Sequence, residues 1–274
     1  MSAKQIHKVI NREVNKVNAP QYRMSINLRI DGLSLLIIQA ENVINAFDYS
    51  WQESDWSTCV SNLNELFSTL VFINYDYQSI DVFIESEQST IVPNDFFNEE
   101  LKQDLLNTYL GSSEYTAYSH KLINEKATVI FGVNTELLEV LSKFLKSPIF
   151  HSSSAMFIDE GLLKNKGYKG ISLIINTNKF EIIANNENGL LGHNNFYYKT
   201  IDEFMFMLLS FAKQKDFDIN TVKLSLHKEL VIGSEIDNQL KRFFGVIDYY
   251  DNKLKNQKEK AFSTLIKYTI IANS

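Results

Sequence analysis

Residues 24–49 read MSINLRIDGLSLLIIQAENVINAFDY, and this stretch decides the fold. Polar and apolar residues alternate at first, and Asp31-Gly32 then stands where a tight hairpin turn is expected. Two apolar runs follow, at residues 33–40 and 43–49. The stretch therefore predicts three consecutive antiparallel strands.

A helix and a fourth strand are predicted directly after these three strands. Ser54 or Asp55 can cap a helix, because a short polar side chain accepts hydrogen bonds from the free amides of the first turn. Leu63 and Phe67 lie four residues apart and would share the buried face of that helix. Ile80, Val82 and Ile84 then recur at every second position, which predicts a half-buried strand at residues 79–85.

The same order of elements is written a second time. Residues 170–198 read GISLIINTNKFEIIANNENGLLGHNNFYY, which predicts three strands with a turn at residues 176–178. A helical pattern at 201–213 and a strand pattern at 221–226 follow. Such a duplication predicts an α/β protein with mixed sheets and two similar lobes with a cleft between them.

The remaining segments complete the predicted domain organisation. Ile6, Ile10, Val14 and Val17 recur at helical spacing, which predicts an amphipathic N-terminal helix. The predicted division is an N-terminal helix at 1–21, a first lobe at 22–165 and a second lobe at 166–274, with the passage between lobes in 161–170. Other predictions are a helix capped by Asn98 and ending near Leu110, a loop or exposed strand at 111–126, a strand at 127–133, a helix at 135–145, a helix-capping serine run at 152–154, and an apolar element at 262–272 left open between helix and strand.

Composition limits the classes of function. Of the 274 residues, 45% are apolar and 22% are charged, which is typical of a folded globular protein. The net charge of −6 argues against broad binding to a phosphate backbone, so no nucleic acid partner is expected. A single cysteine, Cys59, suits a reducing compartment, and no apolar run is long enough to span a bilayer. We therefore expect a cytoplasmic protein without a membrane span.

The duplicated order resembles the ribonuclease H-like fold of the actin, sugar kinase and Hsp70 superfamily. Within it, the chain is most similar to degenerate members such as the actin-like assembly proteins of bacterial pili and secretion systems. Ser89-Thr90-Ile91-Val92-Pro93 with Phe96-Phe97, and Phe150-His151-Ser152, also resemble a bacterial family of uncharacterised proteins with a domain of unknown function. This resemblance implies an actin-like ATPase architecture.

The resemblance also implies where ATP and Mg²⁺ would bind. ATP-binding members place an Asp followed closely by Gly at the first hairpin of each lobe, and the first lobe keeps Asp31, Gly32 and Ser34 there. The second lobe has Asn176-Thr177-Asn178-Lys179 instead, with neither carboxylate nor glycine. The stretch 227–234, where the family needs a paired-glycine turn for adenosine, contains one glycine. A lost or reduced nucleotide site is therefore expected, with no cofactor.

The residues leave two enzymatic alternatives open. One is a nucleotide-dependent switch or ATPase that binds ATP and Mg²⁺ between the lobes. The other is a ribonuclease H-like nuclease, for which Asp31, Glu65 and Asp81 would have to hold two metal ions. The five histidines are scattered without the spacing of a zinc site, so no metal centre is predicted.

The predicted function is a non-catalytic, pseudo-ATPase module for binding or scaffolding, with protein as the expected partner. Aromatic residues are enriched at protein interfaces. Trp51 and Trp56 in the first lobe, and Tyr197 and Tyr198 in the second, are therefore the candidate partner contacts. Core packing is the alternative role for the same side chains.

Overall fold

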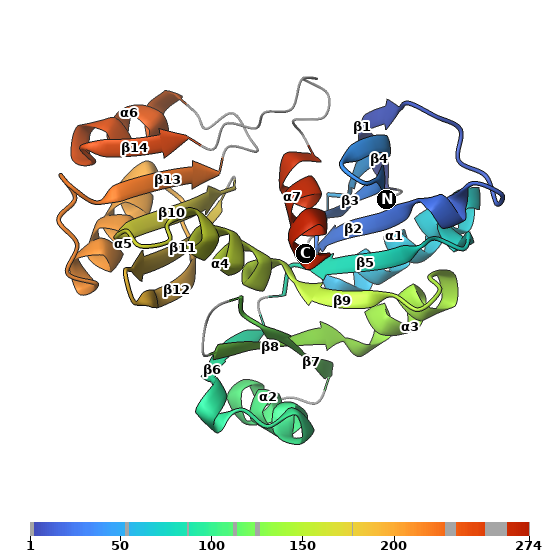
Figure 1. Cartoon of the computed structure of the whole chain (residues 1–274), viewed down its shortest axis with the longest axis horizontal. Coiled ribbons are helices and arrows are strands. Elements are labelled where there is room, and N and C mark those ends of the chain that lie inside the picture. Colours follow the sequence, from blue (N-terminus) through green and yellow to red (C-terminus); the bar gives the residue numbers. More distant parts are fainter. Residues whose placement is uncertain are drawn as a thin grey trace. The chain divides into compact units, whose positions relative to one another are not determined.

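The computed structural model describes residues 3–52, 55–86, 88–111, 114–123, 127–176, 178–227, 234–249 and 262–273 (Figure 1). These residues form two compact units. The first unit comprises the described parts of Met1–Met156 and Leu254–Ser274, and the second unit comprises that of Phe157–Lys253. The C-terminal segment thus groups with the first half of the chain, whereas the sequence assigned it to the second lobe. No helix in the described ranges is long and apolar enough to cross a membrane.

A six-stranded sheet in the order β1-β4-β3-β2-β5-β9 forms the centre of the first unit. Its strands are β1 (Lys4–Ile10), β2 (Arg23–Arg29), β3 (Gly32–Gln39), β4 (Asn42–Ser50), β5 (Ser79–Ile84) and β9 (Ile149–Ser152). Strands β2, β3 and β4 form an antiparallel meander, and β5 and β9 run parallel to β2. The three predicted strands and the position of the fourth are confirmed. The fourth strand is not half-buried as predicted, because β5 is buried from Ile80 to Ile84, with Phe83 5.7 Å from the ring of Tyr268 in the C-terminal helix.

A five-stranded sheet in the order β12-β11-β10-β13-β14 forms the centre of the second unit. Its strands are β10 (Gly170–Ile175), β11 (Lys179–Asn186), β12 (Gly189–Tyr197), β13 (Lys223–His227) and β14 (Val246–Tyr249). The first three are antiparallel, and β13 and β14 run parallel to β10. Apart from β1, the two sheets have the same order and the same strand directions, so the repeated sequence pattern corresponds to a repeated structure.

Strand β1 corrects the prediction of an N-terminal helix. It pairs antiparallel with β4 at the edge of the sheet, and Val9 is its single buried residue. Ile6 and Ile10 are about half exposed, at 49% and 55%. Because Ile6 and Ile10 are four residues apart, they resemble the apolar stripe of a helix. An edge strand with one buried residue shows no alternation of apolar and polar side chains that would indicate a strand.

Helices α1 (Trp56–Thr69), α3 (Thr135–Phe144) and α7 (Ser263–Ala272) belong to the first unit. The side chain of Asp55 caps α1 by accepting a hydrogen bond of 2.8 Å from the Thr58 amide, as predicted. Leu63 and Phe67 lie in the core below it. Residues 262–272, left open by the sequence, form α7, whose Thr269 hydroxyl donates a bond of 2.8 Å to Ser25 of β2.

A small three-stranded sheet in the order β6-β8-β7 is inserted between β5 and β9. Its strands are β6 (Ser89–Pro93), β7 (Tyr115–Lys121) and β8 (Ala127–Asn134), and α2 (Lys102–Leu110) packs against it. Asn98 caps a short 3-10 turn that leads into α2, as expected. Four 3-10 turns are described, η1 (Ala19–Gln21), η2 (Val71–Asn74), η3 (Asn94–Phe96) and η4 (Glu99–Leu101).

Helix α4 (Ser153–Lys164) contains the boundary between the two units, and α5 (Ile201–Gln214) and α6 (Ser234–Phe243) belong to the second. The predicted capping serine is confirmed, because the Ser152 hydroxyl accepts a hydrogen bond of 3.2 Å from the Ala155 amide. The division falls after Met156, and α4 continues into the segment 161–170 where the sequence placed the passage between lobes.

Candidate functional site

The hairpin between β2 and β3 is the candidate phosphate-binding turn of the first unit. Arg29 pairs with Gly32, so the loop itself consists of Ile30 and Asp31. Its two carbonyls are both used by Trp51, whose indole Nε1 donates a hydrogen bond of 2.7 Å to Ile30 and whose amide donates one of 2.9 Å to Asp31. Trp51 therefore locks this hairpin onto the end of β4.

Gly32 is required by the packing of β3 on β4. A Cβ atom at this position would lie 2.3 Å from the carbonyl oxygen of Tyr49 and 3.1 Å from Cα of Ser50. Both obstacles are backbone atoms, which cannot rotate away as a side chain can. The missing side chain thus serves strand packing, which is a sufficient reason for glycine in the absence of any phosphate.

A polar cluster of Arg29, Ser34 and Asp48 fills the space beside this hairpin. The Ser34 hydroxyl donates a hydrogen bond of 2.8 Å to the Asp48 carboxylate and accepts one of 3.0 Å from Arg29 Nη1. The Arg29 guanidinium also lies 3.3 Å from Asp48 Oδ1 and 3.5 Å from Asp31 Oδ1. The hydroxyl and the cation that a phosphate group would need are therefore already engaged by the protein.

Asp31 keeps most of its surface in solvent. Its side chain is 58% exposed, whereas those of Arg29 and Asp48 are 26% and 17% exposed. An exposed ion pair of this length contributes little to stability. Of the three residues named for nucleotide binding, Asp31 is the one whose polar atoms remain largely accessible.

The matching turn of the second unit, between β10 and β11, is held by Tyr198. The Asn176 amide donates a hydrogen bond of 2.8 Å to the Lys179 carbonyl. The Tyr198 hydroxyl donates one of 2.6 Å to the Asn176 carbonyl, and its amide donates one of 2.9 Å to Asn178. Burial raises the pKa of the Tyr198 phenol, which therefore stays a hydrogen-bond donor.

Of the stretch 227–234, where the family needs its adenosine turn, 228–233 lie outside the described residues. His227 is buried at the end of β13, with Nδ1 at 3.4 Å from Glu160 Oε2. The ring of Phe157 meets the imidazole edge-on at 5.0 Å. The imidazole of His227 thus packs in the core of this unit between a carboxylate and an aromatic ring.

The four aromatic residues named as partner contacts have different surroundings. Trp51 and Tyr198 are buried, at 6% and 8% exposure, and each holds one of the two hairpins. Trp56 is partly buried and packs on the core of the first unit. Tyr197, which is 52% exposed at the end of β12, is the member of the set that presents a large surface to solvent.

The three carboxylates required for a ribonuclease H-like nuclease do not meet. Asp81 lies opposite Ser25 in the β2–β5 register, whereas Asp31 follows the other end of β2. Six residues of strand separate the two levels, about 20 Å. Glu65 is exposed on α1, and Asp81 lies 3.0 Å from His151 Nε2. Within the described ranges, no group of three acidic, histidine or cysteine side chains could hold a metal ion.

Cys59 is a packed thiol in the first unit. It is fully buried, and its Sγ lies 3.8 Å from the carbonyl oxygen of Arg29. Burial, with smaller contributions from the Asp31 and Asp55 carboxylates, raises the pKa of the thiol to about 12. A thiol of this pKa is protonated at neutral pH and is a poor nucleophile.

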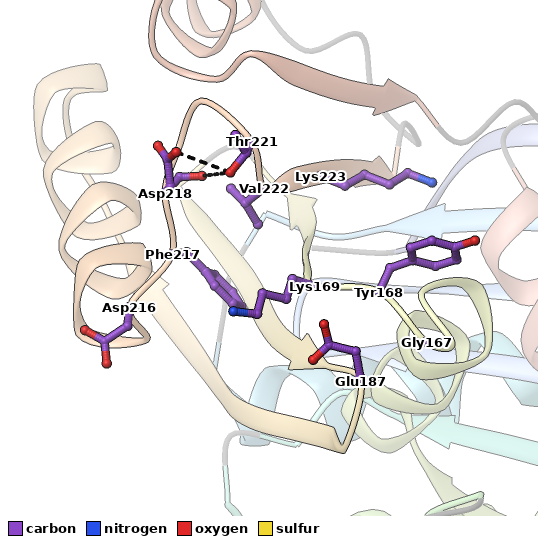
Figure 2. Close-up of a pocket in the computed structure, with 10 residues that line it drawn as sticks. All are labelled: Gly167, Tyr168, Lys169, Glu187, Asp216, Phe217, Asp218, Thr221, Val222 and Lys223. Atoms are coloured by element: carbon purple, nitrogen blue, oxygen red, sulfur yellow. Dashed lines mark hydrogen bonds between the residues drawn. The ribbon is translucent and has the colours of Figure 1, made fainter.

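The second unit contains an open pocket of about 520 Å³ that the sequence did not predict (Figure 2). It is lined by the loop Gly167–Lys169, by Glu187, and by residues of the stretch 216–223. It lies at the amino end of β10, whereas the Asn176 turn follows its carboxyl end, so the pocket does not correspond to the candidate phosphate turn. Lys223 forms an ion pair of 3.0 Å with Asp248, and the Asp218 side chain accepts hydrogen bonds within its own loop.

Three solved structures are similar to this chain over most of its length. One solved structure, a Bacteroides thetaiotaomicron protein with actin-like ATPase fold and unknown function, is 22% identical with a TM-score of 0.76, covering 92% of this chain and 99% of that chain. A protein of a PilM-PilN type IV pilus biogenesis complex is 10% identical with a TM-score of 0.59, covering 92% and 98%. The ethanolamine utilization protein EutJ from Carboxydothermus hydrogenoformans is 10% identical with a TM-score of 0.52, covering 92% and 90%.

These similarities confirm the predicted actin-like ATPase fold. No curated protein matches the chain. The model of one family, described as protein of unknown function (DUF3822), matches residues 11–247. The chain therefore belongs to the DUF3822 family and has the actin-like ATPase fold.

Proposed function

We propose that the protein is a non-catalytic, actin-like module that binds protein partners and has lost nucleotide chemistry. The observation that carries this proposal is the cluster of Arg29, Ser34 and Asp48 at the first hairpin. The Ser34 hydroxyl bonds Asp48 at 2.8 Å, and the Arg29 guanidinium faces two carboxylates. A phosphate group at this hairpin would have to displace these contacts and would meet the negative charge of Asp48.

The second hairpin supports the same proposal. Backbone amides of a glycine turn bind phosphate when they are free to point at it. Here the Asn176 amide is already bonded to Lys179, and the Asn176 carbonyl accepts a bond from Tyr198. The described residues of this turn, Asn176 and Asn178, supply no carboxylate to orient a metal ion.

Protein partners and a cytoplasmic location complete the proposal. A fold of this kind occurs in a PilM-PilN type IV pilus biogenesis complex, where it is part of a protein assembly. The single cysteine is buried and suits a reducing compartment. The acidic composition does not favour nucleic acid.

A nucleotide-dependent switch is the second candidate function, and the exposure of Asp31 favours it. This carboxylate stands at the first hairpin with 58% of its side chain in solvent. It could still orient a hydrated Mg²⁺ ion, since Mg²⁺ usually keeps several waters and takes one or two carboxylates.

Isothermal titration calorimetry with ATP and Mg²⁺ separates the two functions. We expect no saturable heat at millimolar nucleotide and no release of inorganic phosphate from ATP. The matched variants are Asp31→Ala and Asp76→Ala, because Asp76 is another exposed carboxylate of the first unit. Saturable binding that disappears in Asp31→Ala and persists in Asp76→Ala would establish the switch instead.

A further inference from the structure

Strand β12 is an open edge of the second sheet. Within the described ranges, no strand pairs with its outer side. It is nine residues long, GLLGHNNFY, and contains no Lys, Arg, Asp, Glu or Pro. Proteins normally protect long edge strands with such residues, because bare edges pair with other chains. The other edge strands carry such a residue or are short, namely β1 with Lys4 and Lys8, β6 with Pro93, β7 with Lys121, β14 with Asp248, and β9 with four residues.

The backbone of β12 offers hydrogen-bonding groups on this outer side. Tyr198 donates its amide inward to Asn178, so the alternate positions 193, 195 and 197 direct theirs outward. The Asn195 amide agrees with this alternation, because it donates a hydrogen bond of 2.9 Å to the side chain of Asn194 and not to β11. The Asn194 side chain thus accepts a hydrogen bond from an amide that could instead bond to a further strand.

In the first unit, the corresponding edge of the sheet is paired with an additional strand. By sheet order, β4 is the counterpart of β12. Its outer side is covered by β1, which pairs with it antiparallel from Lys4 opposite Ser50 to Ile10 opposite Asn45. In the duplicated architecture this edge therefore has the geometry to extend by one antiparallel strand.

We propose that β12 pairs antiparallel with β12 of a second copy of the chain, which joins the two five-stranded sheets across a twofold axis at Asn194. In this register the outward positions 193 and 195 face each other as hydrogen-bonded pairs. Gly192 lies opposite Phe196 of the other copy, and Leu191, which a β-bulge leaves without a partner on β11, lies level with Tyr197. Leu191 and Tyr197 are 37% and 52% exposed in the single chain, and both lose solvent contact in the dimer.

A second copy suits this edge because the strand is complementary to itself. β12 contains no Lys, Arg, Asp or Glu, so the pairing places no two such side chains of like charge opposite each other. A leucine level with an aromatic ring occurs twice by symmetry, once on each side of the axis. This inference goes beyond the proposed function and does not depend on the loss of nucleotide binding.

Sedimentation equilibrium of the full chain tests the dimer. The average molecular mass of the wild type should rise from 31.6 kDa toward twice that value. This rise is expected as the protein concentration increases to about 100 µM. Tyr197→Lys places a charge at the junction, and Asn195→Pro removes an outward donor, so both variants should stay monomeric. Tyr168→Lys is the matched control, since Tyr168 is 70% exposed in the same unit but lies outside β12, and it should dimerise.

A cysteine cross-link tests the register. Two Asn194→Cys chains would meet at the twofold axis with Cα atoms about 4.5 Å apart, within reach of a disulfide. Oxidation should yield a covalent dimer, whereas Asn188→Cys, at the exposed turn before β12, should yield none. A wild-type chain that stays monomeric, a dimer that survives Tyr197→Lys, or the absence of an Asn194→Cys cross-link would overturn the proposal.

Discussion

Ser34 on β3 donates a hydrogen bond of 2.8 Å to the carboxylate of Asp48 on β4, beside the hairpin where a phosphate group would be expected. Arg29 of β2 reaches the same two side chains, at 3.0 Å and 3.3 Å. Three adjacent strands thus contribute one residue each to a closed polar cluster. The cluster gives the hairpin a structural role that needs no bound nucleotide.

Breaking the cluster should destabilise the first unit. Ser34 is buried, so Ser34→Ala should lower the free energy of unfolding by about 1–2 kcal/mol, and the coupling to Asp48→Asn in a double-mutant cycle should be about 1 kcal/mol. Urea denaturation measures both. Asp76→Asn, in an exposed ion pair of 2.6 Å with Lys146, should cost less than about 1 kcal/mol. Equal effects at Ser34 and Asp76 would show that the cluster is not a stabilising unit.

Gly32→Ala should destabilise the protein even without nucleotide. The new methyl group would lie 2.3 Å from the Tyr49 carbonyl oxygen, so β3 or β4 must shift, at a cost of about 1–3 kcal/mol. Gly192→Ala is the control, because its methyl group would meet the flexible end of Lys215 at 2.8 Å. Urea denaturation should show the larger loss for Gly32→Ala. A neutral Gly32→Ala would mean that strand packing is not the reason for this glycine.

Tyr198→Phe should weaken the second hairpin and change its alkaline stability. The variant loses the bond of 2.6 Å to the Asn176 carbonyl, at a cost of about 1–2 kcal/mol. Burial raises the pKa of Tyr198 in the folded state above its value in the unfolded chain. The contribution of the Tyr198 phenol to stability is therefore complete below the unfolded pKa of about 10 and is lost as the pH rises through the folded pKa. The free energy of unfolding, measured by urea denaturation at neutral and at alkaline pH, should therefore fall less in Tyr198→Phe than in the wild type. Tyr197→Phe, at the exposed neighbour, should follow the wild type.

Cys59 should resist thiol reagents in the folded protein. Burial raises the pKa of the Cys59 thiol to about 12. Near pH 8, roughly one molecule in ten thousand therefore carries the thiolate. Ellman's reagent should find no reactive thiol under native conditions and one equivalent in guanidinium chloride. Rapid reaction of the folded chain would show that the thiol is accessible, and the packing around Arg29 would then be wrong.

The sequence predicted the architecture well where local signals agree with the fold. The hairpin signal at Asp31-Gly32, the Asp55 cap and the apolar spacing at 80–84 each act within a few residues, and the hairpin, the helix and the strand are all present, although the hairpin loop is Ile30-Asp31, one residue earlier than predicted. The N-terminal helix failed because Ile6 and Ile10 lie on an edge strand whose burial follows neither period. Short-range patterns therefore predict the central strands and helices, but not the edge strand β1.

The site was less predictable because its contacts cross strands. Asp48 is 14 residues from Ser34, and no local pattern links them. The sequence leaves Trp51 and Tyr198 open between partner contact and core packing. In the folded chain both are buried, and each bonds a hairpin carbonyl. The pocket of Figure 2 joins three separate loops, so it too has no signal in the sequence.

Thermal unfolding with and without millimolar ATP and Mg²⁺, in wild type and Asp31→Ala, tests the central claim most directly. A ligand at about 100 times its dissociation constant adds roughly 2.7 kcal/mol of stability, which is an easily measured shift. We expect no shift in either protein, because the cluster of Arg29, Ser34 and Asp48 already occupies the polar groups of the first hairpin. A clear rise in Tm that Asp31→Ala abolishes would contradict this account and identify the protein as a nucleotide-dependent switch.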